Sequence, residues 1–175
     1  MSSQMAVQDM GLWFQVQAFL SLEARLMDDH HLNEWVNLFS DDVRYWMPVV
    51  TNRIGRDVGK EISRFGEVAH FDDDKTSLRN RVKRLATGMA WAETPPSRTR
   101  HLVSNVEILE QGGTGELRVR SNFLIYRSHL EYDYEIFSGY REDTLRPQGD
   151  SWQICRRDII LDQSVVTQKN LGIFF

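Results

Sequence analysis

The stretch "ELRVRSNFLIY", residues 116–126, decides the fold class because its apolar and polar residues alternate. Such alternation is typical of a β-strand with one buried face. The same period of two recurs in residues 101–109, 134–143 and 151–161. Two turn sequences lie between these segments, "QGGTG" at 111–115 and "RPQGD" at 146–150. The second half of the chain is therefore predicted to be an antiparallel meander.

Residues 12–26 carry apolar side chains at helical spacing, which predicts a long amphipathic helix. Its apolar stripe is expected to consist of Trp13, Val16, Phe19, Leu20 and Leu26. Glu23 and Arg25 are assigned to its wetter side. A shorter helix is expected from Leu32 to Phe39, ending at the turn-prone residues Ser40–Asp42.

A third helix is predicted to follow the acidic residues 72–74. Asp74 or Thr76 would accept hydrogen bonds from its first free N–H groups, and Gly88 would end it. Its apolar stripe is expected to consist of Leu78, Val82 and Leu85. Residues 43–50 are expected to form a strand with an edge or a bulge at Pro48. A short helix is an option within residues 59–68.

Helices followed by an antiparallel meander indicate an α+β domain, in which a curved, mostly antiparallel sheet wraps round the N-terminal helices. With 175 residues, 41% of them hydrophobic and 26% charged, the chain is expected to be a single domain, residues 1–175. Residues 1–10 are expected to be a flexible N-terminal arm. A net charge of −4 argues against nucleic acid as a partner. No apolar run approaches the roughly 18 residues of a membrane span, so a cytoplasmic location without membrane contact is expected.

The stretch "LMDDHHLNEW", residues 26–35, sets two carboxylates beside two histidines. His30 and His31 would point in different directions on a helix and to opposite faces of a strand, so they cannot easily bind one metal ion together. None of the five histidines has a second histidine three or four residues away. The stretch is interpreted as the corner between two helices, with Asp28 and Asp29 solvated or capping the second helix. A catalytic acid/base pair is the alternative.

Three further groups of residues are candidates for a site. "AHFDDDK", residues 69–75, places His70 beside three carboxylates and is interpreted as an acidic loop before the third helix. A partner contact or a pocket acid is the alternative there. His101 is interpreted as a hydrogen-bonded structural residue, with a pocket base as the alternative. A solvated helix face, or a contact for an acidic protein, is the interpretation of the basic residues Lys75, Arg79, Arg81, Lys83 and Arg84.

The single cysteine and the apolar end of the sequence are also informative. Cys155 excludes an internal disulfide and any motif with two cysteines in this chain, and it is interpreted as a packing residue. The last residues, "NLGIFF" at 170–175, are unusually apolar. Since an exposed apolar end promotes aggregation, residues 171–175 are expected to be buried against the chain's own sheet and a neighbouring subunit.

Several long motifs in one order resemble the small (beta) subunit of bacterial aromatic-ring-hydroxylating dioxygenases, especially the toluene/biphenyl-like branch. They are "EARLMDDHHLNEWVNLFSDDVRYWMPV", "AHFDDD", "SRTRHLVSNV", "IFSGYREDTLR" and "IILDQSVVTQKNLGIFF". The resemblance runs from about residue 12 to residue 175. It implies a cone-shaped α+β fold like that of nuclear transport factor 2, scytalone dehydratase and ketosteroid isomerase. It also implies an α3β3 hexamer with beta–beta contacts, in which the beta subunit supports the alpha trimer.

In that family the Rieske [2Fe–2S] cluster and the mononuclear iron(II) belong to the alpha subunit. A Rieske centre requires two cysteines and two histidines, and the mononuclear iron requires two histidines and a carboxylate. This sequence has one cysteine and no suitably spaced histidine pair. The chain is therefore expected to have no catalytic, cofactor-binding or metal-binding residues of its own.

The main hypothesis is a non-catalytic subunit of an oxidoreductase that adds both atoms of O2 to an aromatic hydrocarbon, giving a cis-dihydrodiol. Electrons would come from NAD(P)H through a reductase and often a ferredoxin, which meet this chain only through the complex. One alternative is a stand-alone dehydratase or isomerase that uses Asp28 or His101 as a base. Another is a ligand-binding or assembly module without enzymatic activity.

Overall fold

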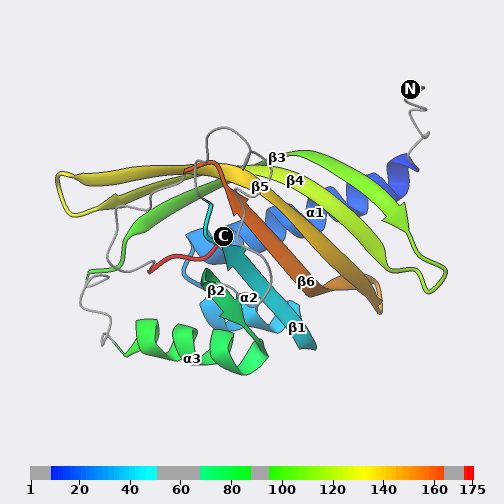
Figure 1. The fold of residues 1–175 in the computed structure, drawn as a ribbon, viewed down its shortest axis with the longest axis horizontal. Coiled ribbons are helices and arrows are strands. Elements are labelled where there is room, and N and C mark those ends of the chain that lie inside the picture. The colour runs from blue at the N-terminus through cyan, green and yellow to red at the C-terminus, as the bar shows by residue number, and fades with distance from the viewer. Residues whose placement is uncertain (1–8, 51–67, 88–94, 164–171) are drawn as a thin grey trace.

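The computed structural model describes residues 9–50, 68–87, 95–163 and 172–175. Its elements follow one another as α1 (Met10–Asp28), α2 (Leu32–Asn37), β1 (Phe39–Pro48), β2 (Ala69–Asp73), α3 (Lys75–Ala86), β3 (Arg98–Gln111), β4 (Leu117–His129), β5 (Asp133–Gln148) and β6 (Ser151–Leu161). Figure 1 shows an arched sheet with α1 running along it and with α2 and α3 near β1 and β2. The predicted α+β class is confirmed.

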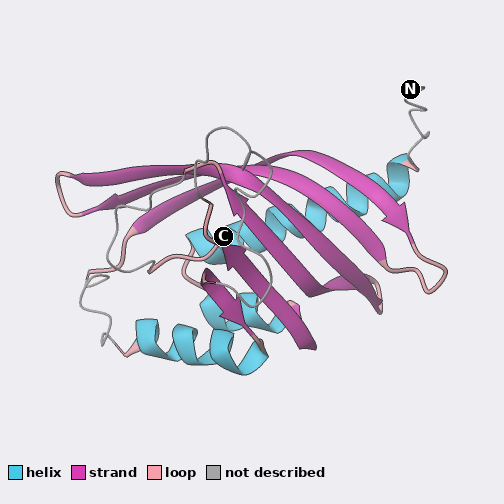
Figure 2. Ribbon diagram, viewed as in Figure 1, coloured by secondary structure: helices cyan, strands magenta, loops and turns pink. Residues whose placement is uncertain are grey.

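The six described strands form one sheet in the order β2-β1-β6-β5-β4-β3, and Figure 2 shows it as a continuous arch. The last four strands pair antiparallel, which confirms the predicted meander. β1 joins this meander by pairing parallel with β6, and it pairs antiparallel with β2. Gly115 (φ 84°) and Gly149 (φ 58°) lie in the two predicted hairpin turns, where positive φ favours glycine.

α1 is the predicted long helix. The carboxylate of Asp9 caps it by accepting hydrogen bonds from the N–H groups of Gly11 and Leu12. Its apolar stripe packs under the sheet, and the indole of Trp13 donates a hydrogen bond to the Val106 carbonyl of β3 at 3.0 Å. Met10 is already helical, and residues 1–8 of the predicted arm lie outside the described residues. The assignment of Glu23 to the wetter side is wrong, because its side chain is fully buried.

The boundary between α2 and β1 differs from the prediction. α2 ends at Asn37, and residues 40–42 belong to β1 instead of forming a turn. The turn-prone residues lie where the β1–β6 register shifts, between Phe39 and Arg44, so a bulge within the strand accommodates them. A second register shift between Met47 and Pro48 confirms the predicted irregularity there, although β1 is not an edge strand.

α3 begins as predicted, because Asp74 caps it by accepting a hydrogen bond from the N–H of Ser77 at 2.7 Å. Leu78 and Val82 are buried and Leu85 is partly buried, which confirms the predicted stripe. The helix ends at Ala86. The predicted end at Gly88 and residues 59–67 of the optional short helix lie outside the described residues.

The end of the chain lies in the core. Phe175 is fully buried, and its ring centroid lies 5.4 Å from that of Phe137 and 6.0 Å from that of Phe123. Phe174 packs against Trp35 with a centroid distance of 4.4 Å. Burial of the last residues against the chain's own sheet is therefore confirmed for residues 173–175. Contact with a neighbouring subunit stays a prediction.

Candidate functional site

The "DDHH" stretch, residues 28–31, is a corner between two helices, as predicted. α1 ends at Asp28, His30 adopts φ 60°, and His31 is the N-cap residue of α2. The N–H of His31 donates to the Leu26 carbonyl at 2.8 Å, which closes the corner. His30 and His31 are both exposed to solvent and are not part of the core.

The prediction that Asp28 is solvated or caps α2 is wrong. Its side chain is only 5% exposed, and no side chain caps α2 through a hydrogen bond. Its carboxylate accepts hydrogen bonds from Thr99 Oγ1 at 3.0 Å and from the backbone N–H of His101 at 3.0 Å. Its Oδ1 also lies 2.6 Å from His101 Nδ1. The structure thus brings together the two residues named as candidate bases.

His101 uses both ring nitrogens within the chain. Nδ1 faces the Asp28 carboxylate, and Nε2 lies 3.1 Å from the carbonyl oxygen of Phe174. A carbonyl oxygen can only accept a hydrogen bond, and Asp28 already accepts from Thr99 and from the backbone. Both contacts are satisfied together only when both ring nitrogens carry hydrogen. The histidine therefore links the end of α1 to the end of the chain, which confirms that it is hydrogen-bonded within the fold. That it has no catalytic role stays a prediction.

The same contacts set the charge of Asp28. Burial alone raises the pKa of this carboxyl, but hydrogen bonds from His101 and Thr99 outweigh burial and hold the pKa below its usual value. Asp28 is therefore ionised at neutral pH. A negative charge at the C-terminal end of a helix is unfavourable by itself, so the pairing with His101 also offsets the dipole of α1.

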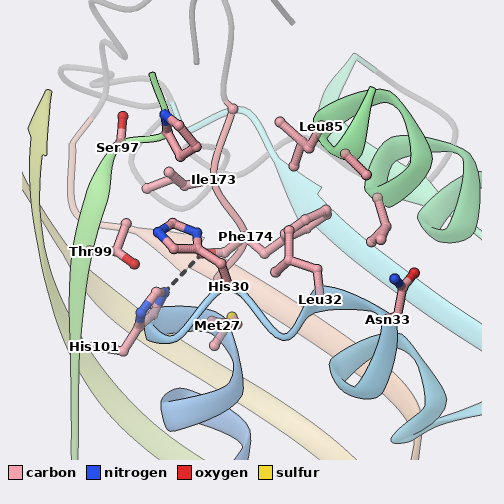
Figure 3. A pocket seen from close by; sticks show the side chains of 14 residues that line it. Met27, His30, Leu32, Asn33, Leu85, Ser97, Thr99, His101, Ile173 and Phe174 are labelled. Carbon is pink, nitrogen blue, oxygen red and sulfur yellow. Dashed lines mark hydrogen bonds between the residues drawn. The ribbon is translucent and has the colours of Figure 1, made fainter. Parts of the chain in front are cut away.

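A cavity of about 280 Å³ opens beside this pair. Figure 3 shows Thr99 and His101 of β3, and Ser97 just before β3, along one side, with Leu85 of α3 and Leu32 of α2 on the other. The remaining lining residues are Met27, His30, Asn33, Val82, Ala86, Pro96, Gly172, Ile173 and Phe174. One wall is thus polar and the opposite wall mostly apolar, which is the composition of small-molecule sites.

Residues 69–73 of the "AHFDDDK" stretch form strand β2 and not the predicted acidic loop, and Asp74 and Lys75 begin α3. Its three carboxylates have separate partners, because Asp72 pairs with Arg44 at 3.3 Å, Asp73 pairs with Arg81 at 2.6 Å, and Asp74 caps α3. Pairing in β1–β2 points neighbouring residues to opposite faces, so the carboxylates do not converge. Burial lowers the pKa of His70 in the same strand.

The five basic residues of α3 have three kinds of surroundings, and Arg81 is the half-buried one that pairs with Asp73. Arg79, Lys83 and Arg84 are exposed, as predicted for a solvated face. Lys75 contradicts that interpretation, because it is buried and its ammonium donates to the carbonyl of Phe39. Its contact joins the start of α3 to β1. A contact between the exposed residues and an acidic protein stays a prediction.

Sequence reasoning missed a buried cluster of four charges. Glu23 of α1, Arg141 and Asp143 of β5, and Arg157 of β6 are each at most 1% exposed at their side chains. Arg157 holds Asp143 with two hydrogen bonds of 2.8 and 2.9 Å. Arg157 also donates to the Phe175 carbonyl at 3.1 Å. Two of these four side chains are positive and two are negative, and their ion pairs connect the helix to the sheet.

The residues present do not fit a Rieske cluster or a mononuclear iron. The one cysteine, Cys155, is buried, and its thiol donates to the Thr144 carbonyl, as expected of a packing residue. Within residues 9–50, 68–87, 95–163 and 172–175, no group of three histidine, cysteine or carboxylate side chains is placed to hold a metal ion. No described helix is long and apolar enough to cross a membrane.

The arched sheet, the N-terminal helices and the lateral cavity define the class of cone-shaped α+β proteins. A scytalone-dehydratase-like protein of Novosphingobium aromaticivorans has this fold, with a TM-score of 0.64 and 17% identity over 89% of this chain and 87% of its own. Naphthalene 1,2-dioxygenase with indole bound in its active site contains a chain that matches more closely. Its TM-score is 0.82, with 19% identity over 98% of this chain and 89% of that one.

Within this class, the chain belongs to the ring hydroxylating beta subunit family, whose model matches residues 22–168. It is 39% identical to the beta subunit of biphenyl 2,3-dioxygenase from Rhodococcus jostii, over 95% of this chain and 90% of that one. It is 42% identical to the beta subunit of benzene 1,2-dioxygenase from Pseudomonas putida, over 94% and 89%. The chain is a subunit of a ring-hydroxylating dioxygenase, an oxidoreductase, and the resemblance drawn from the sequence is confirmed.

Proposed function

We propose that this chain is the non-catalytic beta subunit of a cytoplasmic oxygenase that converts an aromatic hydrocarbon into a cis-dihydrodiol. It would hold a trimer of alpha subunits together in an α3β3 complex. The observation that carries this proposal is the similarity to beta subunits of biphenyl and benzene dioxygenases, which are 39% and 42% identical to this chain over nearly its whole length. The alpha subunit would hold the Rieske [2Fe–2S] cluster and the mononuclear iron(II). A ferredoxin or reductase would meet this chain only as part of the complex.

An exposed apolar patch supports a protein partner. Leu102, Leu124, Tyr126, Tyr134 and Ile136 of β3, β4 and β5 are between 40% and 68% exposed. Leu102 pairs with Leu124, and Tyr126 pairs with Ile136, so they lie side by side on the outer face of the sheet. Contiguous patches of this kind are typical of surfaces that another protein covers.

The geometry argues against a stand-alone dehydratase or isomerase. Such an enzyme needs a base with a free lone pair that reaches the substrate. His101 has none, because Asp28 and the Phe174 carbonyl occupy its two nitrogens. The Asp28 carboxylate is ionised, but its oxygens are occupied by Thr99 and His101, and its side chain is 5% exposed.

The test is to purify the chain alone and together with its alpha subunit. Alone, it should bind no iron and turn over no aromatic compound, whereas the complex should oxidise benzene or biphenyl. Asp28→Asn in the complex should lower thermal stability but leave kcat per complex within a few-fold, and exposed Asp29→Asn should change neither. Stoichiometric iron retained by the chain alone through gel filtration would overturn the proposal. So would turnover by the chain alone.

A further inference from the structure

The cavity beside the Asp28–His101 pair has the size of a small-molecule site. Its volume of about 280 Å³ exceeds that of engineered apolar cavities of roughly 150 Å³ that accept benzene. It lies just below the roughly 300 Å³ at which pockets for larger ligands begin. The cavity is therefore suited to a single ring with one or two small substituents.

The apolar wall is made by residues that a flat ring could contact. Val82, Leu85 and Ala86 come from α3, Leu32 comes from α2, and Ile173 comes from the end of the chain. In Figure 3 Leu85 and Leu32 face the β3 residues across the cavity. Burial of a ring against such side chains removes apolar surface from water, which supplies the driving force for binding.

The polar wall offers acceptors. Thr99 gives its hydroxyl hydrogen to Asp28 at 3.0 Å, so its oxygen keeps lone pairs for a further donor. His101 offers a ligand neither a donor nor an acceptor, because both of its ring nitrogens are engaged. The Asp28 carboxylate on this wall is already paired with the His101 ring, so it does not require a charged ligand. This wall therefore favours a neutral ligand that donates one hydrogen bond.

We propose that this cavity binds a neutral single-ring aromatic molecule that carries a hydroxyl group, of which phenol is the simplest example. The ring packs against the α3 wall, and the hydroxyl donates to Thr99 Oγ1. We assign the site to binding and not to catalysis, because both ring nitrogens of His101 and the carboxylate oxygens of Asp28 are engaged within the chain. This inference rests only on residues of this chain and does not depend on the proposed function.

The test is calorimetric titration of the full chain with phenol, with benzene as the comparison ligand. Ala86→Trp places an indole at the rim of the cavity and should weaken phenol binding at least tenfold. Lys83→Trp is the matched control, because Lys83 is exposed on the same helix and does not line the cavity. It should leave the affinity within twofold. Thermal unfolding without ligand verifies that each variant is folded.

The hydroxyl contact has its own pair of variants. Thr99→Val should weaken phenol binding several-fold while leaving benzene binding unchanged, and Thr99→Ser should restore the phenol affinity. No binding of phenol to the unmodified chain up to about 10 mM would overturn the proposal. Equal phenol affinity in the unmodified chain and in the folded Ala86→Trp variant would also overturn it, because the ligand would then lie elsewhere.

Discussion

The carboxylate of Glu23 lies 2.6 Å from Nη1 of Arg157, although 134 positions separate the two residues in the chain and both side chains are fully buried. The same carboxylate accepts hydrogen bonds of 2.9 Å from Arg141 and from the indole of Trp35. Glu23 is thus the negative centre through which α1 is attached to α2, β5 and β6. Removing one member of such a cluster leaves the others buried without compensation.

Glu23→Gln is therefore expected to destabilise the chain by about 3–5 kcal/mol, the range for breaking a buried ion pair. The change keeps the size of the side chain but leaves Arg141 and Arg157 with one carboxylate between them. Urea unfolding of the purified chain measures the loss. Glu34→Gln is the control, because Glu34 is exposed on α2, and it should stay within about 0.5 kcal/mol of the unmodified chain. Equal stability of the two variants would show that the cluster contributes nothing.

Acid should weaken the fold through the same residue. Burial by itself raises the pKa of Glu23, but the charges of Arg141 and Arg157 outweigh burial and lower the pKa from 4.5 to about 2. Because the folded-state pKa is the lower one, the stabilisation is fully present above pH 4.5 and is lost as the pH falls through about 2. Thermal unfolding between about pH 6 and about pH 3 should show a steeper fall for the unmodified chain than for Glu23→Gln. Parallel curves would contradict this assignment.

The strand pattern could have located three of the four clustered charges. Inward residues of β5 alternate through Phe137, Arg141, Asp143 and Leu145, so the two charged residues share a face with two apolar ones. Arg157 alternates in the same way with Ile159 in β6. Glu23 occupies the buried stripe of α1, four residues after Phe19. Periodicity thus predicts the elements well, whereas the assumption that a charged residue is exposed to solvent fails at these four positions.

The Asp28–His101 contact shows a different limit of sequence reasoning. Both residues were candidates, but 73 positions separate them, and no spacing rule relates residues of a helix to those of a distant strand. Their meeting depends on how α1 packs against β3, which local periodicity does not determine. The cavity cannot be predicted from local sequence patterns either, because its walls come from α1, α2, α3, β3 and the end of the chain.

Gly139 in β5 should tolerate no side chain. A Cβ added there would collide with the carbonyl oxygen of Ile160 in β6 and would lie 2.9 Å from the ring of Phe123. Gly139→Ala is expected to cost about 3 kcal/mol through overpacking, as measured by urea unfolding. Gly113→Ala is the matched change in an open turn, with nothing within 4 Å, and should stay within about 0.5 kcal/mol. A tolerated Gly139→Ala would mean that β5 and β6 separate readily.

Replacing His30 and His31 together by alanine should leave the activity of the reconstituted oxygenase within a few-fold of normal. Both residues are exposed in the corner after α1, and His31 makes an exposed ion-pair contact with Glu34 at 3.5 Å. An exposed pair of this kind contributes little to stability. Steady-state oxidation of benzene by the complex measures the effect. A loss of about 10³-fold, the scale for removing a catalytic acid or base, would instead identify a working site in the corner.

The end of the chain should be required first for folding and then for assembly. The hydroxyl of Tyr45 accepts a hydrogen bond from the N–H of Phe175 at 2.8 Å and donates one to its carbonyl at 2.9 Å, so the last residue is held on both sides. Burial raises the pKa of Tyr45, which keeps this hydroxyl protonated as a donor. Phe175→Ala would remove a fully buried ring and is expected to cost about 3–5 kcal/mol in urea unfolding.

Deleting residues 172–175 should remove still more and prevent the chain from bringing the alpha subunit into a large complex on gel filtration. Tyr132→Ala is the control for losing an aromatic ring, because Tyr132 is 90% exposed and should change neither stability nor complex size. If the truncated chain unfolds at the same temperature as the full chain, the end of the chain does not anchor the core. If the truncated chain is destabilised but still forms a full-sized complex, residues 172–175 stabilise the fold without contributing to the subunit interface.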